Sequence, residues 1–192
     1  MFTVTNTNTV VEKNRERFIK LFRNNVHRHG SEEFLDWLDN ATDFFVAPAS
    51  TRYHDAVDGG LCKHSLEVYD YLIQHGICEA ELESKTIVAL LHDICKTDLY
   101  KKSFRNVKNE AGQWVKEPCY IKEDKRGLGH GSCSVFLIQR FMQLTLPEMQ
   151  AIYNHMSGWS EDQASVGVGF QDNSLALELA VADLRSTYLK NI

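Results

Sequence analysis

The sequence predicts an all-α protein, a bundle of six or seven helices with a small β-hairpin insertion. Apolar residues recur at i, i+3 and i+4 spacing in successive segments, which is typical of helices with one buried face. Capping residues, glycines and prolines separate these segments. The region from 100 to 126 differs, because two extended runs flank a turn-type tetrapeptide there.

A chain of 192 residues has the length of one domain, and no repeat or low-complexity linker divides it. We therefore expect a single domain over residues 1–192. Its core lies at about 50–190, the N-terminal helices of residues 1–49 pack on that core, and residues 100–126 form the hairpin insertion.

Four helices are expected before the hairpin. Residues 1 to 9 are rich in Thr and Asn and are expected to be frayed. The glycine pair Gly59-Gly60 permits a tight backbone approach just before a histidine in the first turn of a helix. The predicted helices begin near Val10, run from Ser31 to about Phe45, span Lys63 to His75 and span about Glu81 to His92.

The predicted hairpin turns at Asn109–Gly112 and is the most basic part of an acidic chain. Two interpretations stay open: a solvated hairpin, or a flap over a binding site that contacts substrate phosphates. Its basic residues and those that follow are Lys101, Lys102, Arg105, Lys108, Lys116, Lys122, Lys125 and Arg126.

The C-terminal third predicts further helices. The run Gly127–Ser132 introduces one, and Thr145 with Glu148 has the spacing of a capping box with proline in the first turn. A loop containing Gly167 and Gly169 is expected before a last helix of about Asn173 to Leu189.

Composition excludes several classes of protein. The formal net charge of -5 disfavours a large footprint on duplex nucleic acid, although a small phosphorylated ligand remains compatible. The five cysteines include no C-x-x-C pair, so neither a disulfide framework nor a four-cysteine zinc site is indicated. No signal peptide or membrane span is evident, and we expect a cytoplasmic protein. Its oligomeric state is not predicted.

The pair His92-Asp93 ends the apolar run Ile87–Leu91 and offers two metal-ligand types at the end of a core helix. Other polar residues on buried sides or at helix ends occur one per helix, and ligands on separate helices of a bundle can converge on one interior point. The predicted metal ligands are His64, His92, Asp93, His130, His155 and Asp183. Such a nitrogen and oxygen set suits Mn, Fe, Co, Ni, Zn or Mg.

This pattern resembles the HD-domain superfamily of metal-dependent phosphohydrolases, whose signature is a His, a His-Asp pair and a distal Asp. The matching residues are His64, His92-Asp93 and Asp183, with 28 residues from the first to the second and 90 from Asp93 to Asp183. The resemblance covers roughly residues 50 to 190. His130 and His155 are similar to the additional histidines of HD proteins that hold two metals.

The segment from Tyr53 to His64 also looks like the leading segment of HD domains attached to 3′-to-5′ exoribonucleases. One departure is Cys95, which stands where the family usually has Gly before Lys96. It leaves the ligands intact, but it could change the loop backbone or make the site sensitive to thiol oxidation.

The resemblance implies hydrolysis of a phosphoester of a nucleotide or short phosphodiester by water activated on one or two divalent ions. Asp93 would bridge or orient the metals, and Lys96 would stabilise charge on the phosphoryl group. Two alternatives stay open: a diiron oxygenase with the same ligands, and a non-catalytic nucleotide-binding regulatory module. Candidate phosphate or substrate contacts besides Lys96 are Arg52, His54, Arg105 and Arg126.

Overall fold

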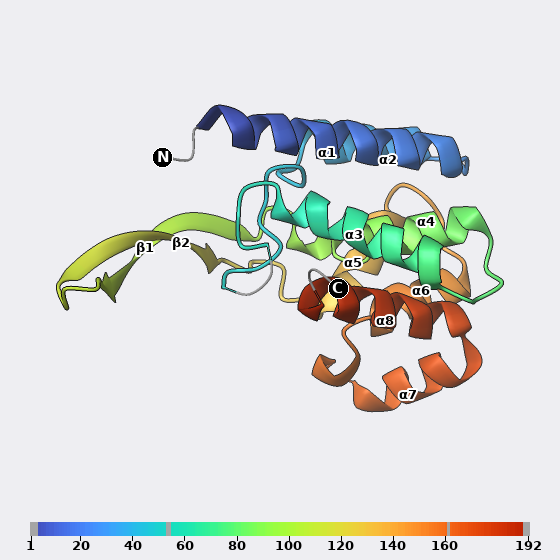
Figure 1. Ribbon diagram of the computed structural model, residues 1–192. Helices are drawn as coiled ribbons and strands as arrows, with labels where there is room; N and C mark the ends of the chain where they lie inside the picture. Colours follow the sequence, from blue (N-terminus) through green and yellow to red (C-terminus); the bar gives the residue numbers. More distant parts are fainter. Residues whose placement is uncertain (1–3, 53–54, 161, 190–192) are drawn as a thin grey trace.

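The computed structural model describes residues 4–52, 55–160 and 162–189, and over these ranges the chain is mostly helical with one antiparallel hairpin (Figure 1). The all-α prediction with a hairpin is confirmed at this level. The elements are α1 (Val4–Asn25), α2 (Ser31–Asn40), α3 (Gly60–His75), α4 (Leu82–Leu91), η1 (Ile94–Lys96), β1 (Tyr100–Lys108), β2 (Trp114–Lys122), α5 (His130–Gln139), α6 (Leu146–Asn154), η2 (Ser157–Trp159), α7 (Gln163–Asp172) and α8 (Ser174–Tyr188).

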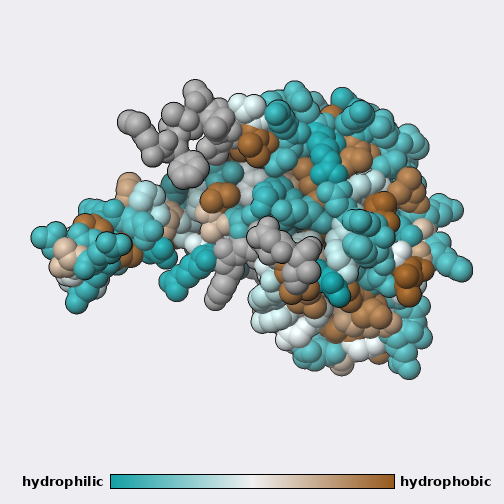
Figure 2. Space-filling view, viewed as in Figure 1, coloured by the Kyte–Doolittle hydropathy of each residue, from teal (hydrophilic) through white to brown (hydrophobic). Residues whose placement is uncertain are grey.

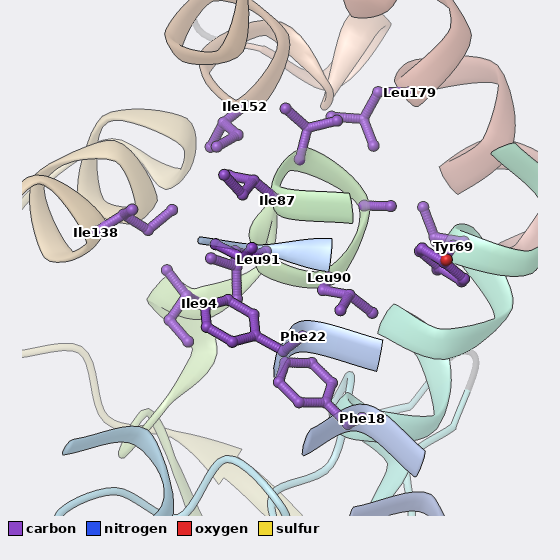
Figure 3. Close-up of a cluster of buried hydrophobic side chains, with 14 of the residues drawn as sticks. Phe18, Phe22, Tyr69, Ile87, Leu90, Leu91, Ile94, Ile138, Ile152 and Leu179 are labelled. Carbon is purple, nitrogen blue, oxygen red and sulfur yellow. The ribbon is translucent and has the colours of Figure 1, made fainter. Parts of the chain in front are cut away.

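Helix α4 lies at the centre of the bundle and contacts α1, α3, α6 and α8. Its residues Ile87–Leu91 are completely buried on every side of the helix, as expected for a helix that is apolar all round. Figure 3 shows Phe18 and Phe22 of α1 packing toward Leu90 and Leu91. The C-terminal end of α4 therefore places His92 and Asp93 in the interior of the bundle.

Helices α1 and α2 lie together on one side of α3 and α4 (Figure 1). Phe22 of α1 stacks on Phe34 of α2 with ring centroids 5.9 Å apart. On the opposite side α8 packs against α3 and α6, and α7 packs outside α6 and α8. The region where α3, α4, α6 and α8 meet is therefore enclosed by helices.

The hairpin extends away from the helical body (Figure 1) and presents a mostly hydrophilic surface (Figure 2). Strand β1 pairs with β2 from Tyr100 opposite Lys122 to Lys108 opposite Trp114. The turn falls where the sequence predicts it, since the Gly112 N–H donates to the carbonyl of Asn109 at 2.9 Å. Most residues of both strands are exposed, so the hairpin is solvated in this arrangement.

Four expectations about helices are wrong. Helix α3 begins at Gly60 and not at Lys63. Helix α1 begins at Val4 and not near Val10, because the modest helix propensities of Thr and Asn cost little once a long helix continues past them. Helix α2 ends at Asn40 and not near Phe45. There the Thr42 hydroxyl donates to the Leu38 carbonyl at 2.7 Å and accepts from the Phe44 N–H at 3.2 Å, so it competes with the helix ladder.

The expected loop around Gly167 and Gly169 is the helix α7, which brings the described α-helices to eight and not six or seven. The Asp162 side chain caps it by accepting from the Ser165 N–H at 3.0 Å. A Cβ at Gly169 would lie 2.5 Å from Nδ2 of Asn154, so this glycine allows close packing of α7 on α6 and does not break the helix.

The capping box of α6 is confirmed: the Thr145 N–H donates to Glu148 Oε2 at 2.7 Å and Thr145 Oγ1 accepts from the Glu148 N–H. Over the described ranges, every helix is too short or too polar to cross a bilayer.

Candidate metal centre

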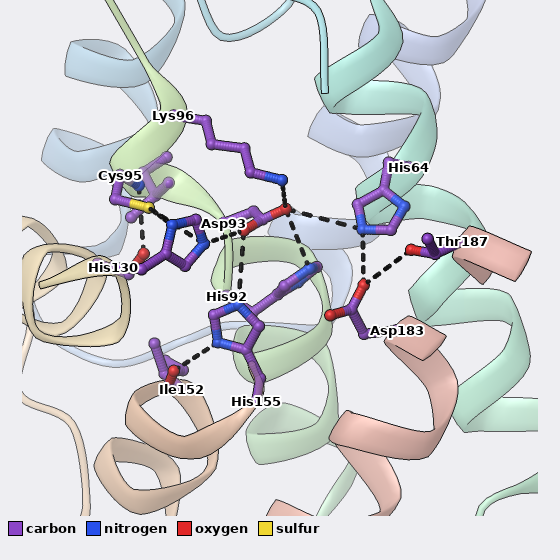
Figure 4. A network of polar contacts seen from close by, with 12 residues as sticks. His64, His92, Asp93, Cys95, Lys96, His130, Ile152, His155, Asp183 and Thr187 are labelled. Carbon is purple, nitrogen blue, oxygen red and sulfur yellow. Dashed lines mark hydrogen bonds and ion pairs between the residues drawn. The ribbon is translucent and has the colours of Figure 1, made fainter. Parts of the chain in front are cut away.

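Six predicted ligands converge at one point between the helices (Figure 4). They come from five places in the fold, mostly at or near the end of a helix, where side chains can project past the helix end. His64 is the fifth residue of α3, His92 and Asp93 follow α4, His130 begins α5, His155 follows α6 and Asp183 lies within α8.

The carboxylate of Asp93 is the centre of this cluster. Its Oδ2 lies 3.5 Å from His92 Nε2 and 3.7 Å from His64 Nε2. Its Oδ1 lies 2.7 Å from His130 Nε2 and 3.5 Å from His155 Nε2. Each carboxylate oxygen therefore faces a different pair of histidines.

Asp183 completes the side of the cluster that Oδ2 faces, with its Oδ1 3.0 Å from His64 Nε2. Sets of three donor atoms that lie close enough to share an ion are His64 with His92 and Asp93, His92 with His155 and Asp183, and Asp93 with His130 and His155. Asp183, which the sequence predicts to be buried, is only partly buried, with 16 % of its side chain exposed.

Backbone carbonyls orient two of the imidazoles. His92 Nδ1 lies 2.9 Å from the carbonyl of Ala89, and His155 Nδ1 lies 2.6 Å from the carbonyl of Ile152. A carbonyl can only accept, so Nδ1 carries the proton in both rings and Nε2 presents its lone pair to the cluster. This is the arrangement in which metal-ligating histidines are held.

The inward nitrogens are the strongest sign of a ligand-binding centre. Nε2 of His92 and Nε2 of His155 are buried and make no hydrogen bond within the described parts of the chain. An unsatisfied buried polar atom costs about 1–3 kcal/mol. A divalent ion between these nitrogens and the carboxylates would satisfy them, so the buried His and Asp groups fit a metal ion.

Lys96 follows one turn after Asp93, and its Nζ lies 2.6 Å from Asp93 Oδ2. Burial disfavours the ammonium charge, but the carboxylate outweighs burial and raises the pKa of Lys96. The pKa of Asp93 is in turn held well below its usual range, because Lys96 and the histidines outweigh burial. Both groups are charged at neutral pH.

Burial and the nearby charges also shift the pKa values of the histidines. Burial lowers the pKa of His92 to about 3 and also lowers that of His130. For His155 burial acts in the same direction, but the nearby Asp93 carboxylate outweighs it and raises the pKa. Burial would raise the pKa of Asp183, yet the hydrogen bond with His64 and the other imidazoles lower it. The neutral His92 ring keeps a lone pair for an ion.

The predicted cationic contacts lie in different places. Arg126 donates to the carbonyls of Cys95 and Thr97, with Nη1 2.6 Å from the Cys95 oxygen, so it holds the turn after Asp93. Arg105 lies on the hairpin and pairs with Glu117 at 3.0 Å, away from the cluster. Arg52 is exposed in the loop before α3, and His54 lies outside the described residues.

Cys95 occupies the turn between the Asp and the Lys. Its N–H donates to Ser134 Oγ at 3.2 Å, and its Sγ lies 3.4 Å from His130 Nδ1. Burial raises the pKa of the thiol to about 12, so the thiol is protonated at neutral pH. The side chain thus packs between η1 and α5 without supplying a thiolate to the cluster.

A pocket of about 570 Å³ opens beside the cluster. Sequence reasoning finds four of its lining residues and misses the rest, among them two aromatic rings. The only sequence signal for those rings is their position shortly after a predicted ligand. The lining residues are Asp93, Lys96, His155, Met156, Trp159, Asp183, Leu184, Thr187 and Tyr188.

Comparisons with protein-family models, with curated proteins and with solved structures find no match for this chain. Its function is therefore inferred from the residues and from their geometry.

Proposed function

We propose that the protein is an HD-type, metal-dependent phosphohydrolase that cleaves a phosphoester of a nucleotide or phosphodiester with one or two divalent ions. The single observation that carries this proposal is the Asp93 carboxylate, whose two oxygens face two separate pairs of histidines. A carboxylate in that position offers one oxygen to each pair of histidines, so Asp93 would be a ligand shared by both sets of donors.

The donor atoms divide into two sets that share Asp93. His64 and His92 would hold one ion with Asp93, and His130 and His155 would hold a second with Asp93. Asp183 lies close enough to His92 and His155 to join either set, and its Oδ1 lies 3.0 Å from His64 Nε2. When bound, divalent ions supply Lewis acidity, lowering the pKa of water from about 15.7 toward 7 and offsetting charge on phosphoryl oxygens. The donors are nitrogen and oxygen without thiolate, which leaves Mn, Fe, Co, Ni, Zn and Mg as candidates.

Lys96 supplies the fixed positive charge of the site. Lys96 lines the pocket, its side chain is 12 % exposed, and its ammonium is anchored by Asp93, so it can meet a phosphoryl oxygen without moving far. A compact ammonium suits a point contact of this kind. Because its pKa is raised, Lys96 remains charged throughout the neutral range and orients the phosphoryl group beside the ligand cluster.

The direct test is turnover with a defined metal. Protein stripped with a chelator and reloaded with Mn, Fe, Co, Ni, Zn or Mg is incubated with a panel of nucleoside mono-, di- and triphosphates, cyclic nucleotides and short oligonucleotides. We expect phosphate or a nucleoside monophosphate to be released from at least one substrate. Asp93→Asn should lower the rate more than about a hundredfold, since even groups that merely support ligands contribute ten- to a hundredfold.

Controls separate this function from its rivals. Asp172→Asn removes an exposed carboxylate at the end of α7 and should leave turnover unchanged. An oxygenase would consume oxygen and fail under anaerobic conditions, whereas hydrolysis would not. A regulatory module would be stabilised by a nucleotide without forming product. Full activity of Asp93→Asn would refute the proposal.

A further inference from the structure

Two exposed aromatic rings stand on the wall of the pocket beside Lys96. Trp159 ends η2 and Tyr188 ends α8, and their rings stack with centroids 6.2 Å apart and planes 23° apart. They are 62 % and 65 % exposed. Because these two rings are exposed, a ligand in the pocket can contact them, whereas it could not reach aromatic rings in the core.

The pocket is lined by two chemically different kinds of residue. Asp93, Lys96 and Asp183 are charged, and Trp159 and Tyr188 are aromatic. A ligand that contacts both kinds needs an anionic group joined to a planar, polarisable group. Phosphorylated sugars, polyols and inorganic polyphosphates have only the first of these, and a nucleotide has both.

The size of the pocket agrees with this class. Its volume of about 570 Å³ lies within the range of roughly 300–1,000 Å³ that small-molecule sites occupy. The apolar side chains of Met156 and Leu184 also line the pocket, so a base placed against the rings would be shielded from water on several sides.

The chain connects each ring directly to a ligand of the metal centre. Trp159 lies four residues after His155, and Tyr188 lies five residues after Asp183. Between His155 and Trp159 the backbone of Ser157 takes a left-handed conformation, with φ of 50°. A non-glycine residue in that conformation is uncommon and is typical of sites where geometry serves a function. Here it forms the turn that brings Trp159 back to the pocket.

We propose that Trp159 and Tyr188 form a stacking platform for the base of a nucleotide substrate, and that this platform makes the site select base-containing phosphoesters over equivalent esters without a base. This inference rests on the proposed phosphohydrolase function and specifies its substrate class. Stacking of a base on an aromatic side chain tolerates every base, so the platform predicts little discrimination among bases.

The test compares matched substrates on matched variants. For the wild type, kcat/KM should be higher for a nucleoside 5′-monophosphate than for ribose 5-phosphate, and higher for a dinucleotide than for glycerophosphodiesters. Trp159→Ala should raise KM for the nucleotide by about 5- to 150-fold, with kcat little changed, because Trp159 is not one of the proposed metal ligands. Trp159→Phe should restore most of the preference, and Tyr188→Leu should reduce it.

Trp114→Ala is the matched control, since that tryptophan is 68 % exposed on the hairpin, away from the pocket. Its kinetic constants should equal those of the wild type. Binding of nucleoside monophosphates is also measured by calorimetry, so that the platform can be assessed without turnover.

The outcomes distinguish the two proposals. Hydrolysis with the same preference in Trp159→Ala as in the wild type would overturn the platform and leave the phosphohydrolase intact. Nucleotide binding that depends on Trp159, with no hydrolysis of any substrate, would overturn the phosphohydrolase and support a nucleotide-binding platform. Neither hydrolysis nor Trp159-dependent binding would overturn both.

Discussion

Replacing His92 with leucine should separate the stability of the fold from the affinity of the centre for metal. His92 is fully buried, its Nδ1 donates to the Ala89 carbonyl, and its Nε2 has no hydrogen-bond partner among the described residues. The substitution therefore removes one satisfied and one unsatisfied polar group at the same time. Leucine is similar in size to histidine, so the change adds little cavity.

These two effects nearly cancel in the metal-free protein. Removing the unsatisfied Nε2 recovers about 1–3 kcal/mol, whereas losing the hydrogen bond to Ala89 and leaving its carbonyl unpaired costs about the same. We expect His92→Leu to change the free energy of unfolding by less than about 1 kcal/mol in chelator. Leu91→Ala, one residue earlier in the same fully buried turn, should cost about 2–5 kcal/mol.

Metal should then distinguish the wild type from the variant. A ligand at a hundred times its Kd stabilises the folded state by about 2.7 kcal/mol, which raises the Tm of a chain of this length by about 5–11 °C. We expect that rise in the wild type and none in His92→Leu, measured by calorimetric melting with and without the metal. His75→Ala, an exposed histidine at the end of α3, should behave as the wild type does.

Two results would refute this reasoning. The first is a large destabilisation of His92→Leu in chelator, comparable to that of Leu91→Ala, because it would mean that His92 Nε2 is satisfied without an ion. The second is an undiminished thermal shift with metal in the variant, because it would place the ion elsewhere.

Three further predictions concern the centre and its support. Asp93→Asn should fold but bind fewer ions per chain than the wild type in elemental analysis, since an amide is a poor bridge between two cations. Gly131→Ala would place a Cβ 2.3 Å from the Tyr153 carbonyl oxygen, so it should cost about 1–3 kcal/mol in chemical unfolding and lower turnover by separating α5 from α6. Arg28→Met should cost about 3–5 kcal/mol, because it leaves the fully buried Glu148 carboxylate without its partner at 2.8 Å. Burial opposes ionisation of Glu148, but Arg28 and the other hydrogen bonds to this carboxylate lower its pKa. In melts of the wild type, the stabilisation should therefore be complete at a pH above the pKa of an unfolded glutamate, about 4.3, and should be lost progressively as the pH falls below that value.

The sequence predicts the residues of the buried His and Asp cluster better than the shape of the pocket. These residues can be found because each is a polar residue at a position where the helical pattern demands an apolar one or a cap, as at His64 and Asp183. A buried polar group is expensive without a partner, so it stands out in a sequence. Trp159 and Tyr188 break no such rule, because an aromatic residue near a helix end is ordinary until the fold brings two of them together.

The errors in the fold have a similar origin. Gly169 favours a loop on local grounds, because glycine lowers helix propensity by about 1 kcal/mol relative to alanine. In the structure the missing side chain allows α7 to approach Asn154, and tertiary packing outweighs the propensity. The hairpin is predicted well because Asn109–Gly112 is a local turn, but its direction away from the body depends on contacts that no local pattern encodes, such as Lys102 with Asp58 at 2.9 Å.

The charges of the centre suggest why an apolar helix leads into it. At neutral pH, the carboxylates of Asp93 and Asp183 together outweigh the ammonium of Lys96 by a single negative charge. That residual charge attracts a cation, and a divalent ion would reverse its sign and so favour an anionic phosphoryl group. Surrounded by the apolar residues of α4, these charges interact more strongly than they would in water. Conversion of Lys96 to Met should therefore tighten metal binding while weakening phosphate binding, and metal and inorganic phosphate titrations of that variant would show whether the two affinities move in opposite directions.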